Sequence, residues 1–118
     1  MSLTINSKTY TADGFATDSV TYLGAAKTVS IKDDVVLRRQ KIRPSSTFSG
    51  VSRTAAKLTR TLALTGALTP TADAFIGADV MVPVGFAAAD VDALLNDMGA
   101  FISSAAFKAH VKSRLINF

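Results

Sequence analysis

The segment SRTAAKLTRTLAL, residues 52–64, divides its side chains into two chemically different sets. Successive side chains of a β-strand point to opposite faces of a sheet, so odd and even positions separate. The even positions are mainly apolar and comprise Ala56, Leu58, Arg60, Leu62 and Leu64. The odd positions are mainly basic or hydroxylated and comprise Arg53, Ala55, Lys57, Thr59 and Thr61. The segment therefore predicts a long strand with one face for covering helices and one face for an anionic partner or for solvent.

The preceding segment VVLRRQKIR, residues 35–43, predicts a second long strand, but it divides less cleanly. Val35 and Leu37 occupy odd positions, as do the cations Arg39, Lys41 and Arg43, and should point to the same face as these cations. Arg38 occupies an even position. A bulge and an edge position both fit this pattern, so both explanations stay open. We expect the two strands together to present their cations on one side of the sheet, and the expected set comprises Arg39, Lys41, Arg43, Arg53 and Lys57.

Shorter extended segments precede these two strands. In SLTINSKTYTADGF, residues 2–15, apolar and polar residues alternate at the start, and Asp13-Gly14 is a dipeptide that favours tight hairpins. We therefore expect a first hairpin to close near Asp13-Gly14, with DSVTYLG, residues 18–24, as the returning strand. The segment KTVSIKD, residues 27–33, predicts one more short strand.

Turn-forming residues separate the later strands. PSSTFSG, residues 44–50, and TGALTPTA, residues 65–72, combine proline or glycine with small polar residues and predict loops. DAFIGADVMVPVGF, residues 73–86, predicts the last strand. Because proline cannot donate a ladder hydrogen bond, Pro83 should lie at a sheet edge or beyond the ladder.

From Ala87 onward the spacing of apolar residues becomes helical. Asp90 and Asp92 lie where a helix N-terminus favours carboxylates, and Ser103-Ser104 can end one helix and cap the next. The expected packing stripes of the two helices comprise Val91, Leu94, Leu95, Met98 and Ile102, and then Phe107, Val111 and Leu115. The sequence thus predicts an α+β fold: an N-terminal hairpin plus an antiparallel β-sheet, followed by two C-terminal helices that pack on one sheet face. At 118 residues, we expect a single domain, 1–118.

The charge of the chain is unevenly distributed. The formal net charge is +4, but residues 27–60 carry +7 and residues 61–107 carry −5. This asymmetry indicates a surface for a polyanion, although a solvated basic face would give the same pattern. The chain has no cysteine, no apolar run long enough for a membrane helix and no signal-peptide pattern, so we expect a soluble, unexported chain with no membrane partner.

Candidate catalytic groups are few. The chain has one histidine, His110, and it has no cysteine and no glutamate. The aspartates show no metal-ligand spacing, and no glycine-rich stretch matches a phosphate loop. The sequence therefore predicts a non-enzymatic protein with no cofactor, no metal and no small-molecule substrate.

The order and length of these segments resemble the coat proteins of single-stranded RNA bacteriophages. The resemblance covers nearly the whole chain: a hairpin around ADG, a short strand TVSIKD, two long strands VVLRRQKIRP and RTAAKLTRTLAL, a last strand ADAFIGADVMVPVGF and two terminal helices. Within it, DVMVPVGFAA is similar to the family's last strand, which runs through Val-Pro or Ile-Pro into the first helix.

The resemblance implies a coat subunit that forms homodimers, with its helices over the partner's sheet, and then an icosahedral shell. It implies a location in the virion, in the host cytoplasm during assembly, and a sheet face that packages single-stranded RNA and in many members binds an operator hairpin to repress translation. Matched positions on the RNA-facing strands are Lys41, Arg43, Arg53, Lys57 and Thr59. Phe75 falls near an aromatic that stacks a base, whereas Gly77 and Asp79 depart from the family's inward pattern.

Other functions and roles stay open from the sequence. A non-viral nucleic-acid-binding module with a basic β-sheet would share the charge pattern without forming particles. A non-viral structural protein would lack the RNA. For Phe75, simple packing within the sheet is an alternative to base stacking.

Overall fold

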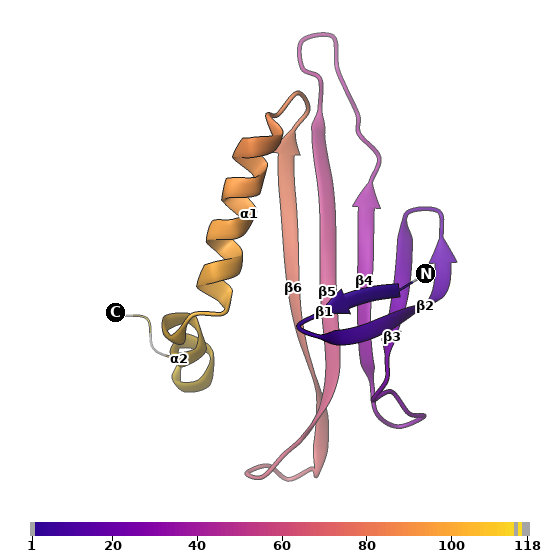
Figure 1. Cartoon of the computed structure of the whole chain (residues 1–118), viewed down its shortest axis with the longest axis vertical. Helices are drawn as coiled ribbons and strands as arrows, with labels where there is room; N and C mark the ends of the chain where they lie inside the picture. Colours follow the sequence, from indigo (N-terminus) through magenta and orange to yellow (C-terminus); the bar gives the residue numbers. More distant parts are fainter. Residues whose placement is uncertain (1, 115, 117–118) are drawn as a thin grey trace. The chain divides into compact units, whose positions relative to one another are not determined.

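The computed structural model describes residues 2–114 and residue 116, which form two compact units, 1–83 and 84–118. Six strands make the first unit and two helices the second (Figure 1). The strands are β1 (Ser2–Ile5), β2 (Lys8–Ala16), β3 (Ser19–Gly24), β4 (Asp33–Gln40), β5 (Val51–Ala63) and β6 (Thr71–Pro83). The helices are α1 (Ala88–Ile102) and α2 (Ala105–Ser113). The predicted order of strands and then helices is confirmed.

The sheet is an antiparallel meander in which each strand pairs with its neighbours in the sequence, in the order β1-β2-β3-β4-β5-β6. Its two long strands β5 and β6 pair over thirteen positions, from Val51↔Pro83 to Ala63↔Thr71. β6 ends at Pro83 and forms one edge of the sheet, as expected from a residue without a ladder donor.

The first hairpin closes at Asn6-Ser7, so the prediction of its turn near Asp13-Gly14 is wrong, whereas the returning strand predicted at residues 18–24 is confirmed as β3. Asn6 and Ser7 have φ values of 49° and 64°, the left-handed pair that a two-residue hairpin turn requires. Gly14 lies inside β2, where the pairing with β3 shifts register between Ala12 and Gly14. The extra residue is accommodated as a bulge, which bends the strand.

The predicted short strand over residues 27–33 is also wrong. Residues 27–32 lie in the connection between β3 and β4, in which the Lys27 amide donates to the carbonyl of Gly24 at 3.2 Å and the Thr28 amide donates to the carbonyl of Ile31 at 2.9 Å. Local turn bonds therefore replace ladder pairing, and the alternating apolar side chains of this segment are exposed.

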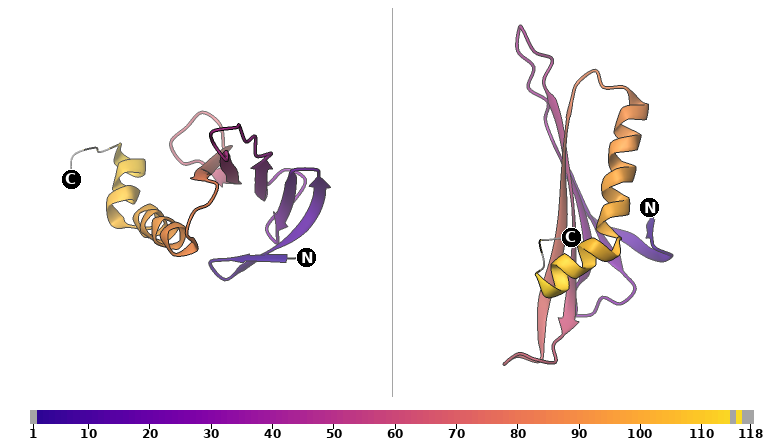
Figure 2. Two further views of the ribbon diagram at one scale, coloured as in Figure 1. Left: turned by 90° about the horizontal axis from the view of Figure 1, so that it is seen from above. Right: turned by 90° about the vertical axis from the view of Figure 1, so that its left-hand side faces the viewer.

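The bend in β2 carries β1 and the first half of β2 across the other strands (Figure 1). Figure 2 (left) shows this hairpin on one side of the remaining strands. The buried core lies on that side: Tyr10, Tyr22 and Val35 are 1%, 7% and 4% exposed. Leu58, one of the mainly apolar even-numbered residues of β5, packs against them, so the predicted apolar face of this strand is confirmed.

In the helical unit, the predicted boundary at Ser103-Ser104 is confirmed. Ser103 is the C-cap of α1, and the Ser104 side chain accepts from the Phe107 amide at 3.3 Å as the N-cap of α2. The rings of Phe101 and Phe107 lie 5.3 Å apart across the junction. These contacts fix the direction in which α2 turns away from α1 (Figure 1).

Candidate nucleic-acid interface

Three cations gather on the sheet face opposite the buried core. In an antiparallel sheet, residues directly opposite each other point to the same face. Arg38 pairs with Ala55, which lies two residues from Arg53 and two from Lys57 along β5. We call the cluster of Arg38, Arg53 and Lys57 the basic face. All three residues are exposed, and the structure shows no ion pair for any of them within the described part of the chain.

Arg38, and not Arg39, belongs to the basic face. Arg39 pairs with Thr54, and both side chains therefore point to the opposite face of the sheet. Its Nε atom lies 3.3 Å from an Asp18 carboxylate oxygen, and its backbone amide donates to the Asp18 carbonyl at 2.9 Å. The prediction that Arg39 shares a face with Lys57 is wrong. β4 is an inner strand with unbroken register, so neither a bulge nor an edge position explains the pattern.

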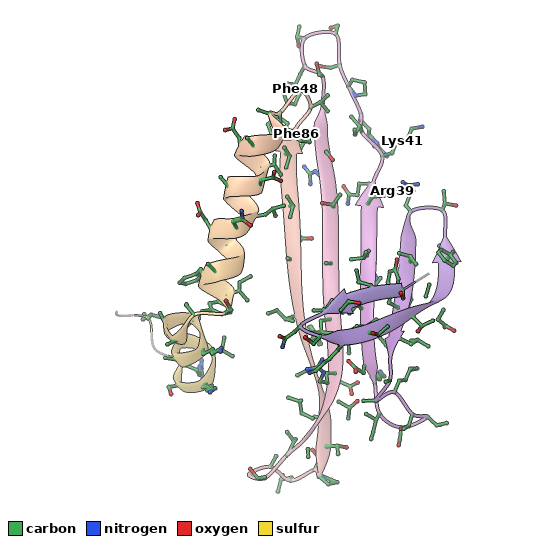
Figure 3. The ribbon with its side chains drawn as sticks, viewed as in Figure 1. Arg39, Lys41, Phe48 and Phe86 are labelled. Carbon is green, nitrogen blue, oxygen red and sulfur yellow. The ribbon has the colours of Figure 1, made fainter. Side chains whose placement is uncertain are left out.

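Lys41 and Arg43 also lie off the sheet face. β4 ends at Gln40, so the expected strand through residue 43 is too long. Residues 41–50 form the loop between β4 and β5, and Figure 3 shows Lys41 just beyond the end of β4. The five predicted cations thus separate into three groups: Arg53 and Lys57 lie on the basic face, Arg39 on the opposite face, and Lys41 and Arg43 in the loop.

A hydroxyl and an aromatic ring extend the basic face along β5 and β6. Thr59 pairs directly with Phe75, which is 68% exposed. The Lys57 ammonium lies 4.4 Å from the centroid of the Phe75 ring, a cation–π contact. Such a high exposure argues against core packing for this ring in a single chain. Base stacking at Phe75 stays a prediction.

A shallow groove of about 310 Å³ runs beside this ring. Its lining includes Arg38, Lys57, Phe75, Gly77 and Asp79. Gly77 pairs with Lys57, and Asp79 pairs with Ala55, so both positions lie on the basic face. The absence of a side chain at Gly77 opens the groove floor, and the Asp79 carboxylate places an acceptor at its wall.

The other carboxylates on this face are held by lysines from a loop. Asp34 lies 3.6 Å from Lys27, and Asp73 lies 3.1 Å from Lys32. Asp73 also accepts from the Thr61 hydroxyl at 2.8 Å, and this bond, with the Lys32 ammonium, lowers the pKa of Asp73 below its ordinary value. These carboxylates are therefore paired at the end of the face away from Arg53.

On the opposite face, Arg60 joins a buried polar network that the sequence did not reveal. Its Nη2 donates to the Tyr10 hydroxyl at 2.9 Å, and Tyr10 donates to the Asp33 carboxylate at 3.1 Å. The hydrogen bond to Tyr10 is the main cause that raises the pKa of Arg60. Because it joins β2, β4 and β5, this network fixes the folded-over hairpin to the sheet. The only indication in the sequence was that Arg60 is the one charged residue among the apolar even-numbered positions of β5.

The predicted packing stripe of the helices is exposed in the single chain. Neither helix has a buried residue. Leu94, Leu95, Met98 and Val111 are 57%, 48%, 56% and 62% exposed, and Val91, Ile102 and Phe107 are half-buried. Leu115 lies outside the described residues. The apolar side chains of the predicted stripe are thus mostly exposed.

Within residues 2–114 and 116, no group of three or more metal-ligating side chains lies close enough to hold an ion. No described helix is long and apolar enough to cross a membrane. The His110 ring lies 6.0 Å from the Phe107 ring.

No protein-family model matches the chain, and no curated protein matches it in sequence. Solved structures do match it in fold. The virus-like particle of Beihai levi-like virus 32 aligns with a TM-score of 0.82 at 15% identity, over 96% of this chain and 91% of that one. The virus-like particle of bacteriophage AVE019 aligns with a TM-score of 0.76 at 15% identity, over 100% and 96%. The coat protein of bacteriophage EMS014 aligns with a TM-score of 0.60 at 15% identity, over 83% and 68%. The chain thus has the fold of levi-like phage coat proteins.

Proposed function

We propose that this chain is the coat protein of a levi-like RNA virus, that residues 1–118 act as one coat domain, and that copies of it form a closed shell located in the virion. The observation that carries this proposal is the fold match over nearly the full length of both chains to proteins in virus-like particles. It also favours a structural, non-enzymatic role.

Dimerisation is the first step of the proposed assembly. β6 is an edge strand of thirteen residues, and only Val80 and Val82 among them are even half-buried. An edge of this length without a lysine or an internal proline is open to pairing with a second copy. On the core side of the sheet, Leu62 and Ile76 are 44% and 46% exposed. We propose that the helical stripe of a partner covers this part of the sheet.

RNA is the proposed ligand of the basic face. The guanidinium groups of Arg38 and Arg53 and the ammonium of Lys57 can neutralise phosphates, and the Thr59 hydroxyl can bond to sugar or phosphate oxygens. Contacts of this kind read the backbone, so we expect packaging to tolerate many sequences. Operator recognition would need base contacts, for which the groove beside Phe75 is the candidate site.

Expression of the chain alone tests the proposal. We expect fast-sedimenting particles in a sucrose gradient, round shells in negative-stain images and an ultraviolet spectrum dominated by nucleic acid. A chain that binds RNA but stays a monomer or dimer would instead support a non-viral nucleic-acid-binding module. Particles without nucleic acid would retain the coat function and remove the RNA-packaging role.

A further inference from the structure

The loop between β4 and β5 encloses a second basic site, which lies apart from the Lys57 groove. We call it the rim pocket and define it by Lys41, Arg43, Phe48 and Arg53, with Asp18 and Arg39 at one side. Its volume is about 670 Å³, within the range of sites that bind small molecules. Figure 3 shows Arg39 and Lys41 near the end of β4 and Phe48 farther along the loop.

Internal contacts order this loop. The Ser45 amide donates to the Phe48 carbonyl at 2.7 Å, which closes a tight turn. Gly50 is buried with φ +99°, and a Cβ there would lie 2.8 Å from Ile42 Cγ2. Ile42 therefore packs against Gly50 and lies outside the pocket lining, whereas its neighbours Lys41 and Arg43 line it. The pocket wall is set by packing of the loop on itself.

The charges in the rim pocket are not balanced. Asp18 is its one carboxylate, and Arg39 already engages it at 3.3 Å. Lys41, Arg43 and Arg53 have no ion pair in the described part of the chain. Three cations that converge on one concave site, with a single neutralised carboxylate, strongly favour a multiply charged anion.

We infer that the rim pocket binds a phosphate group. Guanidinium groups match phosphate oxygens in a bidentate geometry, and Lys41 adds a compact charge. Phe48, 54% exposed at the pocket wall, offers an apolar surface to the organic part that carries the phosphate. The phosphate can come from an RNA chain or from a free phosphorylated small molecule. The inference does not depend on shell formation, and the rim pocket shares only Arg53 with the basic face.

Calorimetric titration of the full-length chain, purified free of nucleic acid, tests this inference. The probes are inorganic pyrophosphate and a 5′-phosphorylated trinucleotide. Loss of a charge-assisted hydrogen bond weakens binding by roughly tenfold for each cation removed. We therefore expect Lys41→Ala/Arg43→Ala to weaken pyrophosphate binding about a hundredfold, whereas Lys8→Ala, at an exposed lysine of β2 outside the pocket lining, leaves pyrophosphate affinity unchanged. Asp18→Asn should tighten pyrophosphate binding, a gain that misfolding cannot produce.

The two probes separate the two sources of phosphate. Pyrophosphate binding that needs Lys41 and Arg43 supports a site for free phosphorylated molecules. Trinucleotide binding that needs these residues, without pyrophosphate binding, supports an RNA phosphate. The inference is overturned if neither probe binds, or if the double variant and Lys8→Ala weaken binding equally. Loss of assembly in the double variant with unchanged binding of both probes also overturns it, because the pocket would then hold another protein copy.

Discussion

The assignment of the basic face predicts how RNA affinity depends on salt. Three cations, Arg38, Arg53 and Lys57, lie on this face without a carboxylate partner among residues 2–114 and 116. For single strands, log K falls by about 0.7 per phosphate neutralised for each unit of log salt, so the face contributes a slope of about −2. Replacement of Arg38 and Lys57 by alanine should flatten the measured slope by about 1.4.

Fluorescence anisotropy with an unstructured RNA oligonucleotide, over a range of salt concentrations, measures this slope on RNA-free protein. The control is Lys8→Ala/Arg39→Ala, which removes the same net charge from two strand positions outside the basic face. We expect the control to keep the parent slope, because Arg39 is engaged by Asp18. An equal change of slope in both double variants, or no change in Arg38→Ala/Lys57→Ala, would refute the assignment.

Three other variants test the fold, the proposed dimer and a surface ion pair. Arg60→Ala leaves the Asp33 carboxylate buried without its cation, so we expect a loss of about 2–4 kcal/mol in the free energy of unfolding, measured with denaturant. Leu95→Asp should abolish dimers in size-exclusion chromatography, whereas Asn96→Asp, off the stripe, should not. Asp73 has a lowered pKa, so its pairing stabilises the fold above the unfolded-state pKa and is lost as the pH falls through the folded-state value. Asp73→Asn should therefore lower the Tm at pH 7 and not at pH 2.

Each of these variants has a contradicting result. An unchanged denaturation midpoint in Arg60→Ala would mean that the polar network does not hold the hairpin. Dimers of the Leu95→Asp protein would place the helical stripe outside the interface. A Tm difference for Asp73→Asn that persists at pH 2 would show that its effect does not come from the carboxylate charge.

Local patterns predicted the element types well because the relevant interactions are short-range. The stripe from Val91 to Ile102 gave α1, and the caps at Ser103-Ser104 gave the break before α2. The alternation of odd and even positions predicted the two faces of β5, because it depends on one strand alone and not on its neighbours.

Pairing between strands was harder to predict from the sequence. The face of Arg38 depends on its partner Ala55, and strand register is a tertiary property. The dipeptide Asp13-Gly14, which commonly marks a tight turn, instead lies at a bulge within β2. The network of Tyr10, Asp33 and Arg60 spans fifty residues of sequence, so its members looked unrelated.

A cryo-electron microscopy reconstruction of the particles formed on expression tests the central claim most directly. The account predicts a closed shell of paired chains in which Arg38, Arg53 and Lys57 face the interior, with density for RNA against β4, β5 and β6. Absence of closed particles, or a shell in which these three side chains face outward, would contradict it.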